Sequence, residues 1–185
     1  SDFEQTGDGQ LAMDFSGAAL GFRDRMIVNG QAQLAGTLGL ELVGGFDPPT
    51  YSTVPIIATA GGVIDTFDQV KGVMYEPGRG LAVTYTPTLV ELTAALLGDG
   101  DLDHDVDFVD FVNLSNNFGG SGTWVDGDYN GSGIIDFPDF VGLSNNFGTS
   151  AAIVDSATIV AVPEPRTLAL LFFGCLASLC RVRVS

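Results

Sequence analysis

The stretch Asp107-Phe-Val-Asp-Phe-Val-Asn-Leu-Ser-Asn-Asn-Phe-Gly119 decides how the chain is organised, because it occurs twice. It returns 29 residues later as Asp136-Phe-Pro-Asp-Phe-Val-Gly-Leu-Ser-Asn-Asn-Phe-Gly148, and 11 of the 13 positions are identical. Shared composition alone does not produce such a match, so the two copies are one unit repeated. Together with the residues that lead into the first copy, the repeat spans residues 98–148.

Each copy is preceded by oxygen-bearing side chains on alternate residues. Counted from the first acid, these side chains and the acids of the copy occupy positions 1, 3, 5, 9 and 12 of a loop. They are Asp99, Asp101, Asp103, Asp107 and Asp110 in loop one, and Asp128, Asn130, Ser132, Asp136 and Asp139 in loop two. This is the ligand spacing of an EF-hand-type calcium loop, in which the seventh residue (Asp105 or Ile134) offers its backbone carbonyl. We therefore predict two bound calcium ions.

The sixth residue of such a loop turns sharply and needs a positive φ, which Gly133 adopts freely and His104 adopts at some cost. His104 could also be a transition-metal ligand, but at position six its side chain points away from the ion. Paired carboxylates could instead form a glycosidase acid/base pair, which requires two different environments that these acids do not have. A solvated acidic face does not explain the alternation either. Metal binding is the favoured interpretation.

One amphipathic helix is predicted after each loop. Phe111, Leu114 and Phe118 share a helical face, as do Phe140, Leu143 and Phe147, and each stretch ends in a glycine suited to a helix C-cap. No helical period precedes either loop. We also expect Val106 and Ile135, at the eighth loop positions, to pair the two loops back to back.

This loop–helix duplication resembles a type I dockerin module over Gly98–Gly148. The resemblance implies two calcium sites and a cohesin-like partner in a polysaccharide-degrading complex. Cohesin-binding members carry small hydroxyl residues just before the helix, where this chain has Phe108-Val109 and Phe137-Pro138. This departure argues against a cohesin of the usual kind. The partner class that the resemblance leaves open is a different cohesin-like protein or an extracellular polysaccharide.

Residues 1–97 are predicted to be β-rich, with short strands between Gly-, Asn- and Pro-containing turns. The expected strands are Leu11–Phe15, Met26–Val28, Thr37–Val43, Val54–Ile57, Leu81–Tyr85 and Leu89–Leu92. Their spacing fits either a β-sandwich or the last coils of a β-solenoid. The phrase Asp24–Leu38, followed by Val43–Phe46, resembles the closing repeats of passenger-like β-helical regions in bacterial surface proteins. This resemblance implies further coils before Ser1.

The C-terminal part is a linker over 149–161 and then a distinct segment over 162–185. That segment contains Pro163-Glu164-Pro165, an apolar run of 13 residues over 168–180 that we expect to be helical, and arginines at 181 and 183. The order resembles the PEP-CTERM sorting signal. It implies export, transient anchoring of 168–180 in the inner membrane, and cleavage near the triplet by an exosortase-type enzyme. The run is shorter than the roughly 20 residues of a spanning helix.

The chain is strongly acidic, with a formal net charge of −16 from 23 Asp and Glu against 7 Lys and Arg. Nucleic-acid binding is excluded on this ground, because phosphates require a basic surface. No catalytic constellation is visible, so we predict a non-enzymatic, exported protein of the cell surface or extracellular matrix. The alternative is that the chain is the accessory region of a polysaccharide-degrading enzyme whose catalytic domain lies upstream.

Overall fold

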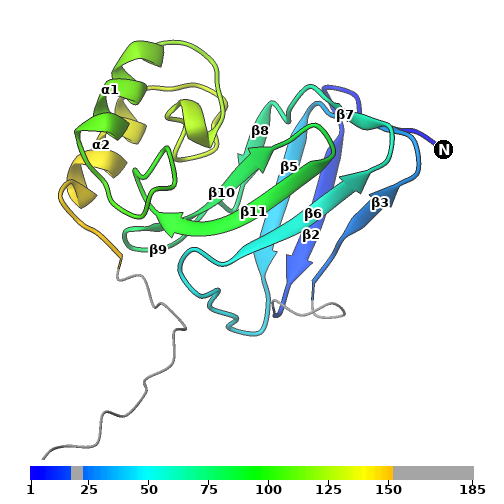
Figure 1. Ribbon diagram of the computed structural model, residues 1–185, viewed down its shortest axis with the longest axis horizontal. Helices are drawn as coiled ribbons and strands as arrows, with labels where there is room; N and C mark the ends of the chain where they lie inside the picture. Colours follow the sequence, from blue (N-terminus) through cyan, green and yellow to red (C-terminus); the bar gives the residue numbers. More distant parts are fainter. Residues whose placement is uncertain (18–22, 152–185) are drawn as a thin grey trace, which may run out of the picture. The chain divides into compact units, whose positions relative to one another are not determined.

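The computed structural model describes residues 1–17 and 23–151, and these residues belong to one compact unit (Figure 1). The described chain is mainly β with two short helices after the strands, as predicted. The predicted apolar helix over 168–180, the sorting segment and most of the linker lie outside the described residues. In the part that the structure describes, no helix is long and apolar enough to cross a membrane.

All six predicted strands are present. They are β2 (Gln10–Phe15), β3 (Met26–Val28), β5 (Thr37–Leu42), β6 (Thr53–Thr59), β10 (Arg79–Tyr85) and β11 (Leu89–Leu96). Five further strands of two or three residues were not predicted because, unlike Met26–Val28, none of them is uniformly apolar and all are too short to show an alternating pattern. They are β1 (Phe3–Glu4), β4 (Gln31–Gln33), β7 (Gly62–Ile64), β8 (Gln69–Lys71) and β9 (Met74–Glu76).

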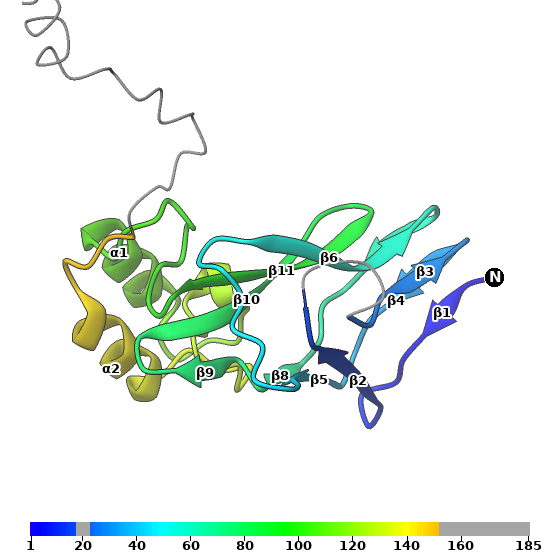
Figure 2. The ribbon, with the colours of Figure 1, turned by 90° about the horizontal axis from the view of Figure 1, so that it is seen from below.

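The first eight strands stack in parallel, so that each strand from β4 to β8 lies on a strand from the preceding pass of the chain. β1, β4 and β7 form one stack, and β2, β5 and β8 form a second. β3 and β6 begin the third, also in parallel. The chain therefore visits the three sheets in the same order on its first two passes, and successive passes lie on one another as coils (Figure 2). Their interior is filled by buried apolar side chains such as Phe15, Leu34, Leu38 and Ile56.

The third stack changes direction after β6. β11 pairs antiparallel with β6 on one side and with β10 on the other, and β10 continues antiparallel to β9. An antiparallel hairpin thus replaces a further parallel coil. β11 leads directly into loop one, which begins at Asp99.

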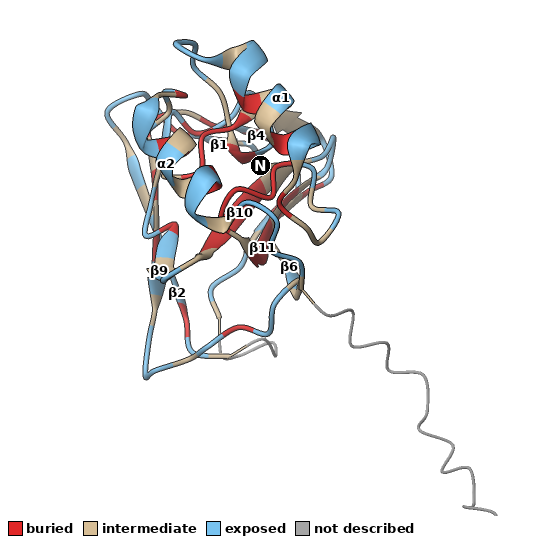
Figure 3. Ribbon diagram, turned by 90° about the vertical axis from the view of Figure 1, so that its left-hand side faces the viewer, coloured by how far each residue is buried: buried red, intermediate tan, exposed pale blue. Residues whose placement is uncertain are grey.

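The helical segment is built against this hairpin. It consists of α1 (Phe108–Asn117), a 3₁₀ turn η1 (Trp124–Asp126) and α2 (Phe137–Asn146). Its buried side chains share one cluster with strand residues, among them Val73, Ala82, Ala95, Leu114, Trp124 and Leu143. Gly80 permits the closest approach, since a Cβ there would lie 2.6 Å from Cη2 of Trp124. Figure 3 shows β10 and β11 largely buried beside the helices, whose outer faces are exposed.

The prediction that the last phenylalanine of each repeat shares the buried face of its helix is wrong. Leu114 and Leu143 are buried as predicted, but Phe118 and Phe147 are 54% and 52% exposed. Both phenylalanines follow the last helical residue and have extended backbone (ψ 127° and 130°), so the helical period no longer applies to them. The glycines after them do have the expected positive φ of 84° and 79°.

The predicted pairing of Val106 with Ile135 is also wrong. Val106 exchanges backbone hydrogen bonds with the segment after α2, accepting from the N–H of Gly148 and donating to the carbonyl of Thr149. Ile135 does the same with the segment after α1. Each loop is therefore paired with the chain that leaves the other loop's helix. Both side chains are fully buried between the helices, which is the role that favours apolar residues there.

Candidate metal centre

Loop one is curled by hydrogen bonds from its own backbone to its acidic side chains. Asp99 Oδ2 accepts the N–H of His104 at 3.1 Å. Farther along, Asp101 Oδ1 accepts the N–H of Asp103 at 3.2 Å, and Asp103 Oδ1 accepts the N–H of Asp105 at 3.1 Å. Such local side-chain-to-backbone bonds stabilise a tight turn in a segment that has no helix or strand.

Asp110 closes loop one from the first turn of α1. Its Oδ1 accepts the N–H of Gly100 at 2.8 Å, and its Oδ2 accepts the N–H of Asp107 at 2.8 Å. Asp107 is the N-cap of α1 and accepts the N–H of Val109 at 2.6 Å. Asp107 and Asp110 form a capping box. The residues that start α1 therefore also place the carboxylate of Asp110 beside Gly100, at the beginning of the loop.

The six carboxylates of loop one gather in two groups of three. Each group has one carboxylate oxygen per residue, and these oxygens lie within 4.8 Å of one another. The groups are Asp99, Asp101 and Asp103, and Asp105, Asp107 and Asp110. Both groups could hold a metal ion. The sequence predicted only a backbone carbonyl from Asp105, but its carboxylate joins the second group as well.

Loop two repeats the first turn of loop one. Asp128 Oδ2 accepts the N–H of Gly133 at 2.8 Å, as Asp99 Oδ2 accepts that of His104. The turn residues have the predicted positive φ, 83° for Gly133 and 86° for His104. Asp128 Oδ1 accepts a second N–H, from Ser132, at 3.0 Å. The first acid of each loop is therefore fixed by the backbone at the sixth position.

Asp139 closes loop two as Asp110 closes loop one, although Asp136, unlike Asp107, has no side-chain cap hydrogen bond. Asp139 accepts the N–H of Asn130 on Oδ1 at 3.0 Å and that of Asp136 on Oδ2 at 2.9 Å. Ser132 Oγ donates to the carbonyl of Ile134, the predicted seventh ligand, at 3.0 Å. All predicted ligand positions of loop two are thus in the same short loop, with an amide and a hydroxyl in place of two carboxylates.

Three carboxylate oxygens of the two loops are buried and have no hydrogen-bond partner among the described residues. They are Oδ1 of Asp99, Asp105 and Asp136. Asp99 is the most demanding case because its side chain is completely buried. A buried carboxylate oxygen without a donor or a cation is costly, and native structures retain few of them. These oxygens have the free lone pairs that a hard cation would use.

Burial raises the pKa of five carboxyl groups that are predicted ligands. The direction is upward for Asp99, Asp101, Asp110 and Asp139, although backbone N–H donors oppose the shift. For Asp128 burial is the largest cause and raises the pKa to about 6, with the N–H groups of Gly133 and Ser132 acting against it. A raised pKa means that the folded loops disfavour their ionised carboxylates, a cost that a bound cation would offset.

Three aromatic residues outside the ligand pattern support the loops, and the sequence pattern did not identify their contacts. Trp124 is buried and donates from Nε1 to the carbonyl of Asp99 at 2.7 Å. The Tyr129 hydroxyl lies near Gly100, where a Cβ would be 2.7 Å from it. Tyr51, between β5 and β6, donates its hydroxyl to Asp99. No local spacing predicts such contacts, because they depend on how the hairpin and the loops pack.

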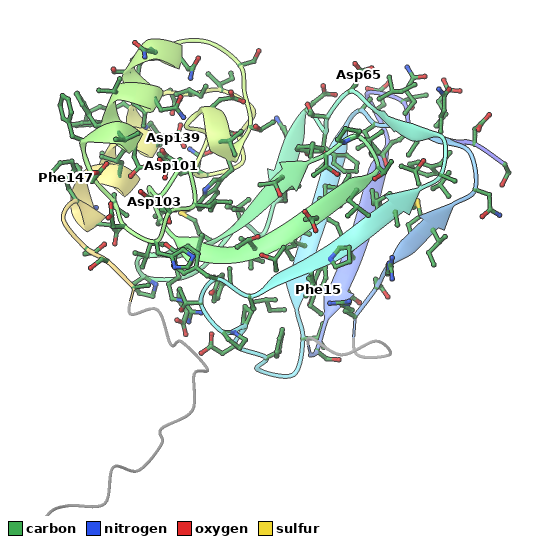
Figure 4. The ribbon with its side chains drawn as sticks, in the orientation of Figure 1. Phe15, Asp65, Asp101, Asp103, Asp139 and Phe147 are labelled. Atoms are coloured by element: carbon green, nitrogen blue, oxygen red, sulfur yellow. The ribbon has the colours of Figure 1, made fainter. Side chains whose placement is uncertain are left out.

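The acids of the two loops lie together in the helical segment. Figure 4 shows Asp101, Asp103 and Asp139 there, distant from Asp65 at the turn between β7 and β8. No protein family, curated protein or solved structure matches the chain. The assignment of the site therefore depends on the geometry of the loops.

Proposed function

We propose that residues 99–110 and 128–139 each bind one calcium ion, and that the chain is a non-enzymatic, exported surface protein stabilised by these ions. The main support for the calcium sites is that buried carboxylates converge and that some of their oxygens have no hydrogen-bond partner among the described residues, above all Oδ1 of Asp99. The same backbone pattern holds the first acid in both loops. This shared pattern supports two cation sites of the same kind and not merely a solvated acidic face.

The donor set favours calcium over other cations. Every predicted ligand is a carboxylate, amide, hydroxyl or carbonyl oxygen, which suits a hard cation and not zinc or copper. The ring of His104 is stacked on Tyr51, with centroids 3.8 Å apart, and is engaged there. Calcium accepts the many, unevenly placed oxygens of a flexible loop, whereas magnesium requires near-octahedral geometry and retains its waters.

Calorimetric titration of the full chain with calcium tests the sites and their ranking. We expect two sites, with loop one the tighter, because five of its side-chain ligands are carboxylates and only three of those in loop two are. Asp139→Ala leaves loop one to be measured, and Asp110→Ala leaves loop two. The ranking is wrong if the variant that retains only loop two binds calcium more tightly, and the proposal fails if the unmodified chain binds none.

The calcium affinity measured in this titration should fall as the pH is lowered. Because the folded-state pKa of Asp128 is about 6, above the ordinary value of 3.8, protons compete with calcium as pH falls through 6. Without calcium, acidification should instead stabilise the folded chain, since the folded chain then binds protons more tightly than the unfolded chain. Its stability should rise as pH falls from 6 toward 4, by at most about 3 kcal/mol from Asp128. A calcium affinity unchanged between pH 7 and pH 5 would contradict the assignment of buried carboxylates as ligands.

We further propose that residues 162–185 are a sorting signal and that the stacked strands are the end of a β-solenoid on an exported protein. The parallel stacking of two complete sheets and of β3 on β6 supports the solenoid. The order of triplet, apolar run and arginines supports the signal. Replacing Pro163-Glu164-Pro165 with alanines should leave an uncleaved, membrane-retained form in the native host. Released protein of normal size in that variant would reject the sorting proposal.

A second candidate function is docking as the accessory region of a polysaccharide-degrading enzyme. It is favoured by a row of four phenylalanine rings across the two helices. Phe108, Phe111, Phe140 and Phe137 follow one another with centroid distances of 5.8, 6.3 and 6.1 Å, and the two outer rings are 64% exposed. A cohesin-like domain should then bind the chain in calcium and not in chelator. Absence of binding in calcium would reject this candidate.

A further inference from the structure

We propose that Tyr51 is a positioning residue for the calcium site of loop one, so that the β region completes a site whose ligands all lie in the helical segment. This inference rests on the proposed calcium binding. Tyr51 lies in the connection between β5 and β6, far in sequence from Asp99. Nothing in the spacing of the loop requires it.

Tyr51 contacts loop one at its first and sixth positions. Its hydroxyl donates to Oδ2 of Asp99, the first ligand. Its ring stacks on His104, the sixth residue, with centroids 3.8 Å apart and planes 20° apart. One side chain from the β region therefore holds the start of the loop and its sharpest turn together.

These contacts leave one oxygen of Asp99 available. Oδ2 accepts two hydrogen bonds, from the Tyr51 hydroxyl and from the N–H of His104. Oδ1 is buried and has no partner among the described residues. One carboxylate oxygen of Asp99 lies within 4.8 Å of oxygens of Asp101 and Asp103. The hydroxyl thus fixes the rotation of the carboxylate and favours calcium binding through Oδ1.

The backbone of Tyr51 indicates that this placement is maintained against a local cost. Its φ is 60°, in the left-handed region that a bulky residue seldom adopts. Its N–H donates to the carbonyl of Ala94 in β11, the strand that leads into loop one. Unfavourable backbone conformations persist where the surrounding structure determines them, and they concentrate at functional sites.

Loop two provides an internal comparison. Among the described residues, the carboxylate of Asp128 accepts hydrogen bonds from the backbone N–H groups of Ser132 and Gly133, and no tyrosine hydroxyl donates to it. The β region does reach loop two, where the N–H of Val70 donates to the carbonyl of Gly131 at 2.9 Å. That contact is with the backbone and not with a ligand. Loss of the Tyr51 hydroxyl should therefore affect loop one only.

The test is calcium titration of full-length Tyr51→Phe in two backgrounds. In Asp139→Ala, which leaves loop one, we expect the calcium Kd to rise by about 10-fold, as is usual when a hydrogen bond to a metal ligand is lost. In Asp110→Ala, which leaves loop two, we expect less than a twofold change. Tyr75→Phe is the matched control, since it removes a hydroxyl of β9 that donates to neither loop. Asp139→Asn serves as a second loop-one background if Asp139→Ala does not fold.

Each outcome decides the proposal. An unchanged loop-one Kd in Tyr51→Phe overturns it. An equal weakening of both loops, accompanied by a lower unfolding temperature in calcium, also overturns it, because that result identifies a general packing role. If the Tyr51-containing loop-one background binds no calcium while it is folded, the calcium site itself is wrong, and the inference falls with it.

Discussion

Removing calcium should lower the midpoint of thermal unfolding of the whole chain on the order of 20 °C, and not only that of the helices. An ion bound only by the folded state contributes RT ln(1 + [L]/Kd), about 4 kcal/mol per site at a thousandfold excess over Kd. For a unit of this size each kcal/mol corresponds to about 2–4 °C. Two sites therefore produce a large shift.

The charge distribution gives the physical reason. Residues 98–150 contain 10 acids and no Lys or Arg. Three carboxylate oxygens within 4.8 Å of one another repel by about 1 kcal/mol per pair even in water. The helical segment shares its core with β10 and β11, so the loss of the loops should be felt by the strands.

Circular dichroism melts of the full chain in calcium, in magnesium and in chelator measure this effect. Magnesium is the control, and it should stabilise far less than calcium. Identical unfolding midpoints in calcium and in excess chelator would contradict the account, and an equal response to magnesium would contradict the choice of ion.

Trp124→Ala should destabilise the folded chain by about 3–5 kcal/mol, the usual cost of removing a buried aromatic side chain. Trp124 is 4% exposed, contacts the position of Gly80, and packs edge-to-face on Tyr129 with centroids 5.3 Å apart. Its Nε1 also holds the carbonyl of Asp99 at 2.7 Å. The substitution therefore opens a cavity and releases the start of loop one.

Chemical denaturation with and without calcium measures this prediction. Val125→Ala is the matched control, because the neighbouring side chain is 43% exposed and should cost less than 1 kcal/mol. A loss for Trp124→Ala no greater than that for Val125→Ala would show that the helical segment does not depend on its packing against the hairpin.

The local features of this fold could be predicted from the sequence because they depend on neighbouring residues. The positive φ of His104 and Gly133 follows from loop position alone, and the structure confirms both. A strand as long as Gln10–Phe15 could be predicted because its residues alternate between the two faces of the sheet. Phe118 was placed on the wrong face because the pattern does not mark the residue at which the helix ends.

The long-range features could not be predicted in this way. Gln31–Gln33 and Gln69–Lys71 are strands only because they stack on strands of an earlier pass, and their sequences contain no strong β signal. The same holds for Tyr51, whose turn sequence gives no reason to expect a contact with Asp99. Such contacts come from packing between segments far apart in the chain.

Anomalous diffraction from crystals of the chain grown with a lanthanide in place of calcium tests the central claim most directly, because it locates each ion. We expect two strong peaks, one within residues 99–110 and one within 128–139. Each peak should be surrounded by the named oxygens at roughly the 2.3–2.6 Å of calcium sites, with Oδ1 of Asp99 among them. Well-ordered loops without such peaks, or peaks bound only by lattice neighbours, would contradict it.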